Sequence, residues 1–374
     1  MRVLIVGHSL VNPLNRARVA ALARHEDLTL QVLTPHRWTG RHGEEYVVAE
    51  QPAGDGYRLS PHRVFFRGAN RQHVYLYGPG LTRVIRDYAP DLVHIEEEPY
   101  SLVTFQLARA AERLRVRWLL TSFQNLDKRY PPPFCCTQSW VLKRAHGALA
   151  GSPATERVLR ARGFAGRAAP VALGVDPAVY APGSEPALAT RLGLSGFVAG
   201  YVGRFERVKG LDGLLRALAA VPACTLLMVG AGPDEAALRT LARELGVDAR
   251  IVWVPTVTHL EVPRHLRVMD CLVLPSVTTP TIQEQFGRVL VEAMACGVPV
   301  IGSSSGAIPA VIGDAGLVFP EGDSTALARC LGELASSPER RAAFAAAGRA
   351  RALSTYTWDA IARGIAALYR EVLQ

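Results

Sequence analysis

The stretch EQFGRVLVEAMACGVPVI, residues 284–301, places a short helix between two glycines and carries two carboxylates. Gly287 interrupts the chain just before the helical run RVLVEAMAC, and Gly297 with the following proline ends that run. Glu284 therefore lies in the loop before the predicted helix, and Glu292 lies inside the helix, eight residues or about two turns further along than Glu284. The branched apolar run VPVI follows at once, which is typical of a buried strand in a parallel sheet.

The start of this predicted helix offers a place for a polar or anionic ligand. A helix N-terminus presents unpaired N–H groups and a positive dipole end, so Phe286, Gly287 and Arg288 form a candidate cradle. Glu284 can accept hydrogen bonds from hydroxyl groups beside that cradle. Glu292 lies on a helix rich in Val and Ala and needs partners there. The spacing alone also fits a solvated loop glutamate and a surface helical glutamate, so a second motif has to decide.

Outward from this stretch, apolar strand-like runs alternate with helical patterns along the whole chain, which predicts an α/β fold of βαβ units. A chain of 374 residues exceeds what one hydrophobic core usually supports. Residues 171–194 are rich in Pro and Gly without a clear period and are the predicted linker. We therefore predict one domain over residues 1–174, joined by a C-terminal helix at 357–374, and a second domain over 175–356.

The net charge of +9 is concentrated in the first domain. Residues 1–175 hold 24 Lys and Arg against 14 Asp and Glu. A basic domain attracts nucleic acid, anionic lipid surfaces or phosphorylated substrates. No nucleic-acid-binding motif accompanies the charge, so we predict no nucleic-acid partner.

The chain contains no apolar run long enough for a transmembrane helix and starts without the pattern of a signal peptide. We expect a cytoplasmic protein, or one peripheral at the inner face of the membrane through its basic first domain. The six cysteines show no metal-ligand spacing and are expected to be reduced core residues.

The second motif is GYVGRFERVKGLDGLLRAL, residues 200–218, which reads as strand, glycine turn and helix. Gly203 ends the strand, and Arg204 and Lys209 lie in the turn before the helix. Two cations at a helix start suit a diphosphate, whereas an exposed basic loop would be the ordinary alternative.

These two motifs together resemble the family 4 retaining glycosyltransferases of the GT-B fold, whose signature is two glutamates separated by seven residues. The resemblance implies two doubly wound Rossmann-like domains that face each other across a cleft, the first on the acceptor side and the second binding a nucleotide sugar. It also implies transfer of a hexose from a UDP- or GDP-linked donor to a hydroxyl acceptor with retention. Such enzymes need neither a metal ion nor a cofactor, since cationic side chains and a helix end stabilise the leaving diphosphate.

The resemblance assigns roles residue by residue. Arg204 and Lys209 match the basic pair on the donor diphosphate, Glu284 the glutamate that faces the donor sugar, and Glu292 the glutamate that binds the ribose hydroxyls. The remaining donor-binding candidates are Gly7, Asn15, Gly203, Thr256, Val257, Phe286, Gly287 and Arg288, of which Thr256 and Val257 match the loop that touches the base.

The chain departs from the family pattern in three loops. The first strand is followed by GHSLVNPLNR, in which Gly7 stands alone where the family often has two glycines, so this loop is expected to be more rigid. Gln285 replaces the family's usual glycine after the first glutamate. Gln124 and Asn125 stand where many members have a histidine that meets the sugar, and an amide there can only form hydrogen bonds.

Further acceptor-side candidates lie at strand ends of the first domain. His94 ends the strand DLVHI and is followed by three glutamates. It suits a role in orienting an acceptor, although such a histidine is more often structural and such a glutamate run more often a solvated turn. Lys128 and Arg129, in the stretch KRYPPPF, suit the lining of an acceptor site.

The acceptor implied by the basic first domain is a phosphorylated or lipid-linked hydroxyl compound. Two alternatives stay open at this point. Instead of a glycosyltransferase, the chain can be another GT-B enzyme, such as an epimerase or a phosphorylase. It can also be a nucleotide-sugar-binding protein without turnover.

Overall fold

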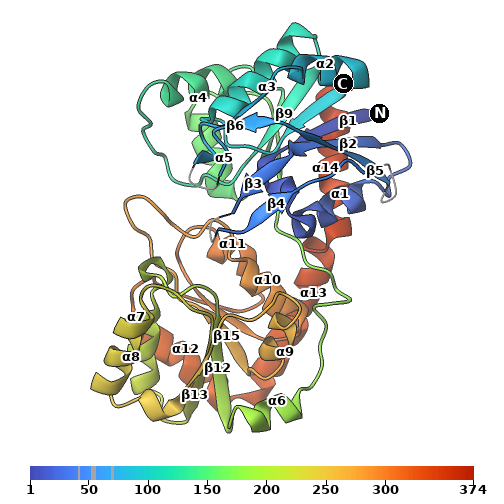
Figure 1. Cartoon of the computed structure of the whole chain (residues 1–374). Helices are drawn as coiled ribbons and strands as arrows, with labels where there is room; N and C mark the ends of the chain where they lie inside the picture. Colours follow the sequence, from blue (N-terminus) through green and yellow to red (C-terminus); the bar gives the residue numbers. More distant parts are fainter. Residues whose placement is uncertain (41–42, 52–55, 69–70) are drawn as a thin grey trace. The chain divides into compact units, whose positions relative to one another are not determined.

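A computed structural model describes residues 1–40, 43–51, 56–68 and 71–374. The chain divides into two compact units, of which unit 1 comprises residues 1–172 with 358–374 and unit 2 comprises residues 173–357. In Figure 1, unit 1 runs from blue to green and ends with the red helix α14. These limits lie within two residues of the predicted domain boundaries.

Unit 1 is built on a seven-stranded parallel sheet with the strand order β11-β10-β9-β8-β1-β2-β5. Its strands are β1 (Arg2–Val6), β2 (Thr29–Pro35), β5 (Tyr57–His62), β8 (Leu92–Ile95), β9 (Arg117–Ser122), β10 (Gly147–Ala150) and β11 (Arg167–Pro170). Two small antiparallel sheets pair β3 (Arg37–Thr39) with β4 (Glu45–Val47), and β6 (Val64–Phe65) with β7 (Leu76–Tyr77). The central strands are continuous apolar runs because both faces of a parallel sheet are buried.

The helices of unit 1 are α1 (Ala17–Leu22), α2 (Leu81–Tyr88), α3 (Leu102–Arg113), α4 (Phe134–Leu142), α5 (Pro153–Ala161) and α14 (Trp358–Leu373). Short 3₁₀ helices η1 (His8–Val11) and η2 (Pro13–Arg16) follow β1. Helix α14 joins unit 1 because Ile361, Ile365 and Tyr369 recur at the spacing of one helix face and are buried in the core. An ion pair of 2.8 Å between Arg370 and Asp27 also ties α14 to this unit.

Unit 2 contains a six-stranded parallel sheet with the order β14-β13-β12-β15-β16-β17. Its strands are β12 (Phe197–Val202), β13 (Cys224–Val229), β14 (Ile251–Val254), β15 (Cys271–Leu274), β16 (Val300–Ser303) and β17 (Leu317–Phe319). Its helices are α6 (Pro186–Arg191), α7 (Leu211–Ala219), α8 (Glu235–Glu244), α9 (Val262–Leu266), α10 (Arg288–Ala295), α11 (Ile308–Ile312), α12 (Ser324–Ser336) and α13 (Pro338–Thr355), with 3₁₀ helices η4 (Arg207–Lys209) and η5 (Asp248–Arg250). The strand order reverses between β12 and β15, and ligands of such sheets bind beyond the strand ends at this point.

The predicted linker at residues 171–194 needs a correction. From residue 173 onward it belongs to unit 2, and it contains helix α6. Pro186 sets the first turn of that helix and Leu188 is buried beneath it. Tyr180, from the same stretch, is only 1% exposed. The segment is therefore packed into unit 2, because a few apolar side chains anchor it in spite of its Pro and Gly content.

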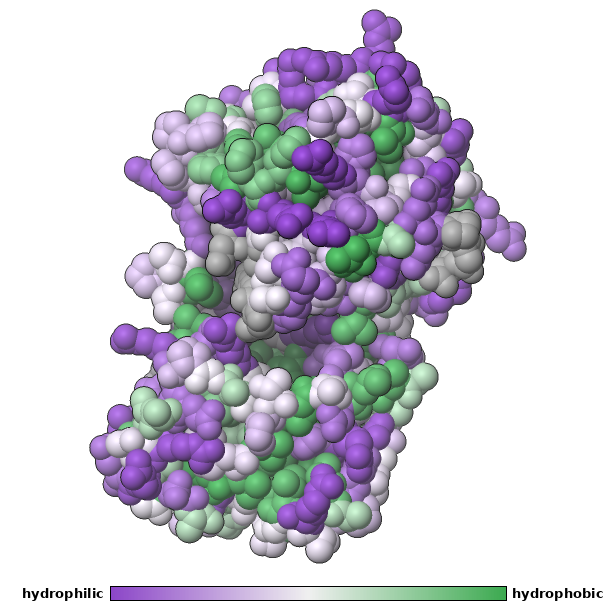
Figure 2. All heavy atoms as spheres, in the orientation of Figure 1, coloured by the Kyte–Doolittle hydropathy of each residue, from purple (hydrophilic) through white to green (hydrophobic). Residues whose placement is uncertain are grey.

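The surface seen in Figure 2 is mostly hydrophilic, with hydrophobic residues in separate groups. Cys224, Cys271 and Cys296 are buried as predicted. Cys136 is exposed, and Cys135 and Cys330 are partly exposed, which corrects the expectation that all six are core cysteines. Within the described residues, no helix combines the length and the apolar character that crossing a membrane requires.

Candidate functional site

The loop between β12 and α7 brings the predicted basic motif to the strand-order switch of unit 2. Gly203 and Gly210 have φ angles of 153° and 60°, a region that favours glycine. A Cβ at Gly210 would collide with the backbone carbonyl of Pro275, so glycine is required for this close approach. The loop that carries Lys209 thus packs directly on the residues that follow β15.

This packing brings Lys209 to Glu284, which lies 75 positions further along the chain. The Lys209 Nζ donates to Glu284 Oε2 at 2.7 Å, and the Ser276 hydroxyl donates to the same oxygen at 2.9 Å. Burial alone would raise the pKa of Glu284, but Lys209, Ser276 and the Phe286 N–H hold it below its usual value. Glu284 is therefore a largely buried, ionised hydrogen-bond acceptor.

Arg204 lies at the start of the same loop with its side chain about half exposed. Its Nε forms a 2.6 Å ion pair with Glu206, and its carbonyl accepts a 2.8 Å hydrogen bond from the Tyr201 hydroxyl. The pKa of Tyr201 is raised by burial and then by the charge of Glu284. Tyr201 thus lies within the electrostatic reach of Glu284 and also holds the Arg204 backbone.

Helix α10 begins at Arg288, directly after Gly287, whose φ angle is 80°. The Phe286 side chain is 4% exposed and packs edge-on against Tyr356, so this residue anchors the loop while its backbone N–H serves Glu284. The Arg288 side chain does not extend the predicted cradle, because its Nε lies 2.9 Å from Glu292 Oε1 one turn further along. The predicted cradle consists of the N–H groups at the helix start, so its role in binding a ligand stays a prediction.

Glu292 is 7% exposed and faces the interior of unit 2, which excludes the surface-glutamate alternative. Burial raises the pKa of its carboxyl, while the charge of Arg288 and a hydrogen bond from Tyr180 oppose that rise. The predicted base-contact residues Thr256 and Val257 follow β14, and His259 in the same loop lies 3.4 Å from Arg288 Nη2. The contact between His259 and Arg288 thus connects the loop after β14 to helix α10.

Sequence reasoning missed three residues of this site, namely Ser276, Tyr180 and His259. Ser276 follows β15 at the edge of the sheet where ligands bind, and this position was a usable signal. His259 lies in the stretch that supplied Thr256 and Val257. Tyr180 carried no signal, because it comes from the segment predicted to be a linker.

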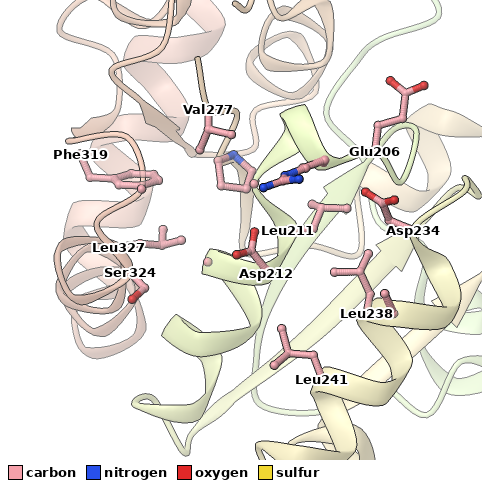
Figure 3. A pocket seen from close by; sticks show the side chains of 16 residues that line it. Glu206, Leu211, Asp212, Asp234, Leu238, Leu241, Val277, Phe319, Ser324 and Leu327 are labelled. Carbon is pink, nitrogen blue, oxygen red and sulfur yellow. The ribbon is translucent and has the colours of Figure 1, made fainter. Parts of the chain in front are cut away.

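A separate pocket of about 320 Å³ is lined in part by Glu206, Arg207 and Gly210 of the basic loop of unit 2. Figure 3 shows the Asp212 carboxylate pointing into it among Leu211, Leu241 and Leu327. Lys209, Glu284 and Glu292 are not among the residues that line it. This pocket is therefore distinct from the carboxylate site.

In unit 1, the predicted donor-side loop after β1 is held in two 3₁₀ turns. The Asn12 side chain accepts from the Leu14 N–H at 3.0 Å, and the Asn15 amide donates to the Ser9 carbonyl at 2.8 Å. A Cβ at Gly7 would approach the Glu96 Cβ at 2.9 Å, so glycine suits this position. The loop is thus internally hydrogen-bonded, and its expected rigidity and the donor contacts of Gly7 and Asn15 stay predictions.

The acceptor-side prediction for His94 is wrong. His94 is fully buried, with its ring nitrogens each 2.7 Å from a hydroxyl, one of Tyr369 and one of Thr121. These contacts join α14 and β9 to β8, so the structural alternative holds. A histidine without exposed surface cannot touch an acceptor.

The three glutamates after His94 are also not a solvated turn. Glu96 pairs with Arg18 at 2.5 Å, and Glu97 accepts from the Tyr75 hydroxyl at 2.6 Å and contacts His8 Nδ1 at 2.7 Å. Glu98 accepts from the Ser122 hydroxyl at 2.6 Å and from the Phe123 N–H at 2.8 Å. Each carboxylate therefore ties the end of β8 to a neighbouring element.

The burial of His94 predicts how the stability of the protein depends on pH. Burial, and then the charge of Arg18, lower the pKa of His94 well below 6.5, whereas an unfolded histidine takes up a proton near that value. The contribution of the neutral, buried His94 to the free energy of unfolding is then complete above about pH 6.5. Below that pH the free energy of unfolding falls by up to ~1.4 kcal/mol per pH unit. Urea unfolding at several pH values should show this slope in the wild type and a smaller one in His94→Gln. Equal slopes would contradict the prediction.

The other acceptor-side candidates of unit 1 follow β9. Gln124 is 8% exposed, and its amide donates to the Leu126 carbonyl at 2.7 Å, so this side chain shapes its own loop. Asn125 is likewise buried. Lys128 is partly exposed and Arg129 exposed. Only these two basic residues of the group are open to solvent, so their predicted role in lining an acceptor site stays a prediction.

About half of the chain, mainly in unit 2, is similar to known glycosyltransferases. Residues 191–351, within unit 2, match the family model of Glycosyl transferases group 1. The D-inositol 3-phosphate glycosyltransferase of Segniliparus rotundus is 35% identical over 216 residues, which cover 54% of this chain and 46% of that protein. The enzyme of that name from Mycobacterium marinum is 31% identical over 211 residues, which cover 54% and 44%. The chain thus spans about half the length of the curated relatives it matches.

Solved structures match over the whole chain. HepE from Anabaena, solved in complex with UDP, has a TM-score of 0.76 at 20% identity and covers 99% of this chain and 100% of its own. Sucrose-phosphate synthase from Thermosynechococcus elongatus has a TM-score of 0.73 at 21% identity, with 100% and 99% covered. The fold is GT-B. Of its two Rossmann-like units, the second contains the stretch that matches the group 1 glycosyltransferase model, and Lys209, Glu284 and Glu292 lie within that stretch.

Proposed function

We propose that this GT-B protein transfers a hexose from a UDP- or GDP-linked sugar to a hydroxyl acceptor, with retention and without a metal ion. The observation that carries the proposal is the largely buried, ionised Glu284, held by Lys209 and Ser276 where the strand order reverses. A carboxylate that only accepts hydrogen bonds suits the hydroxyls of a sugar. The group 1 family match and the relatives named as glycosyltransferases support this choice of reaction.

The second carboxylate supports a nucleotide sugar as the donor. Glu292 lies about one turn beyond the start of α10, on the same helix whose N-terminus follows Glu284. In the proposal, Glu284 accepts from the transferred sugar, Glu292 accepts from the ribose, and the diphosphate lies between them near Lys209 and Arg204. The structural neighbour HepE was solved with UDP-glucose, which fits a donor of this class.

The proposed chemistry is front-face substitution. The bond from the anomeric carbon to the β-phosphate oxygen breaks, and a bond to the acceptor oxygen forms on the same face. The departing β-phosphate takes the acceptor proton. An ammonium has three N–H donors and Glu284 engages one, so Lys209 can also neutralise the leaving phosphate, with Arg204 as the second cation.

Donor binding can be tested before any acceptor is known. UDP-, GDP-, ADP- and dTDP-glucose differ in their nucleotide. We expect one of the four to raise the melting temperature of the wild type, because a ligand that binds only the folded state stabilises it. Glu292→Ala should lose this rise, whereas Glu244→Ala, an exposed glutamate on α8, should keep it. Failure of every nucleotide sugar to shift the wild type would contradict the proposed function.

A second candidate is a GT-B protein that binds a nucleotide sugar without turnover. The observation that favours it is the first loop of unit 1, where Gly7 is followed by two hydrogen-bonded 3₁₀ turns. Hydrolysis of the bound donor in the absence of an acceptor would separate the two candidates, since a protein without turnover releases no free sugar.

A further inference from the structure

Two adjacent phenylalanines on the surface of unit 1 take no part in the proposed reaction. Phe65, the last residue of β6, is 41% exposed, and Phe66, which follows it, is 59% exposed. Phe66 also has a φ angle of 56°, a conformation that a bulky residue rarely adopts. A strained backbone and an exposed aromatic ring are both unfavourable in the isolated chain, and strain of this kind gathers where a protein binds something. The pair therefore indicates a partner that covers these rings.

Arginines accompany the two rings without acidic residues to balance them. Residues 56–86 contain six arginines and neither aspartate nor glutamate. The three that lie nearest to the rings in the sequence are all exposed, namely Arg63, Arg67 and Arg71. Within the described parts of the chain none of these three pairs with a carboxylate, and the Arg63 guanidinium lies 5.4 Å from the centre of the Phe65 ring. Their positive charge is thus available to an anionic partner.

The short hairpin that carries Phe65 is fixed to the core of unit 1. β6 pairs antiparallel with β7, with Val64 opposite Tyr77 and Phe65 opposite Leu76. The Gln106 side chain on α3 accepts from the Tyr77 N–H at 2.9 Å and donates to the Tyr77 carbonyl at 2.8 Å. The hairpin is therefore anchored through β7, while β6 ends in the exposed rings. Because the rings are already held in place, binding has little disorder to remove.

The combination of aromatic rings with unpaired arginines suits the surface of an anionic lipid bilayer. Aromatic rings enter the boundary between headgroups and acyl chains, and arginines are attracted by negatively charged headgroups. A protein partner would have to supply a carboxylate at a fixed position for each arginine, whereas a bilayer offers negative charge across its whole surface. Residues 1–175 also hold 24 Lys and Arg against 14 Asp and Glu, which favours approach to such a surface. Figure 2 shows hydrophobic residues of unit 1 grouped where Figure 1 places β6 and α3, with hydrophilic residues along their border.

The rings and the exposed arginines form one surface at the end of β6, which comprises Arg63, Phe65, Phe66, Arg67 and Arg71. We propose that this β6 surface docks onto a bilayer that contains anionic lipids. The rings enter the boundary region, and the arginines contact the headgroups. The inference does not depend on the proposed reaction, since none of these residues belongs to the carboxylate site of unit 2.

Co-sedimentation of the full chain with lipid vesicles in about 0.15 M salt tests this proposal. The vesicles consist of phosphatidylcholine alone or of phosphatidylcholine with about one third phosphatidylglycerol. We expect the wild type to bind the anionic vesicles about tenfold or more tightly than the neutral ones, because each arginine near a negative surface adds roughly fivefold. Arg67→Gln should accordingly weaken binding to the anionic vesicles about fivefold.

Phe66→Gly separates membrane binding from folding. Glycine suits the φ angle of 56°, so the variant should fold with a melting temperature close to that of the wild type. It should nevertheless bind the anionic vesicles about tenfold more weakly, since burial of a phenylalanine side chain is worth roughly tenfold or more in partitioning. A variant that keeps its melting temperature and loses vesicle binding would show that the ring serves a partner and not the fold.

Two variants in unit 2 are the matched controls. Leu353→Ser removes an exposed leucine from α13, and Arg216→Gln removes an exposed arginine from α7. Both should bind anionic vesicles like the wild type. Wild-type protein that stays in the supernatant with anionic vesicles, or Phe66→Gly that binds them equally well, would overturn the proposal. A dimer in solution that Phe66→Gly abolishes, without vesicle binding by the wild type, would assign the β6 surface to a second copy instead. None of these results affects the donor-induced rise in melting temperature, which tests the proposed function separately.

Discussion

Lys209→Ala is expected to lower kcat of sugar transfer or donor hydrolysis by about 10²–10³-fold, the cost typical of losing one preorganised group that stabilises developing charge. Lys209 is the cation that reaches Glu284 at 2.7 Å from a half-buried position, whereas Arg204 is more exposed and pairs with Glu206. The loss should appear mainly in kcat, because the charge on the leaving phosphate develops in the transition state. Kinetics with the nucleotide sugar that stabilises the wild type will measure it.

Arg207→Ala is the control for this prediction, because Arg207 lies on the same 3₁₀ helix but is exposed. Its removal should change kcat by no more than about twofold, as for ordinary surface substitutions. A second readout is the acidic limb of the pH–rate profile. Lys209 lowers the pKa of Glu284, so its loss raises that pKa and moves the limb to higher pH. Near wild-type kcat with an unmoved limb would exclude the catalytic role of Lys209.

Gly306→Ala is expected to destabilise the protein by about 2–5 kcal/mol and to reduce activity in the fraction that folds. Gly306 has a φ angle of 55°, where a Cβ costs about 1–2 kcal/mol, and overpacking adds about 1–3 kcal/mol. Its Cβ would collide with the backbone carbonyl of Glu284, which also accepts a 3.0 Å hydrogen bond from the Ala307 N–H. Relief of this collision requires the Glu284 backbone to shift, and its carboxylate then moves relative to Lys209.

Gly322→Ala separates the cost of a Cβ at a positive φ angle from the cost of the collision with the Glu284 carbonyl. Gly322 has a φ angle of 79°, but a Cβ there would meet no atom within 4 Å. This variant should lose only about 1–2 kcal/mol and keep full activity. Urea unfolding and donor kinetics on both variants provide the comparison. Equal stability and equal activity of the two variants would show that the contact between Gly306 and Glu284 does not support the site.

By itself, the sequence predicted those features that depend on neighbouring residues. Apolar runs and helical periods predicted two parallel α/β units, because burial on both faces of a sheet leaves a local pattern. Glycines at 203, 210 and 287 marked the turns before α7 and α10, which placed Lys209 in a loop and Glu292 inside a helix. β5 leaves no such pattern, because its sequence YRLSPH mixes polar residues and a proline with apolar ones.

Only the tertiary structure decided which of these residues meet. Lys209 contacts Glu284 because the strand order places β12 beside β15, an arrangement that no local pattern encodes. Arg288 turns to Glu292 because a buried carboxylate requires a partner. Tyr180 joins them because its segment packs into unit 2. Likewise, His94 is a structural residue because β8 lies inside the sheet between β9 and β1, and α14 returns to cover it. Spacing along the chain limits what each residue can do, but burial and long-range packing select its partner.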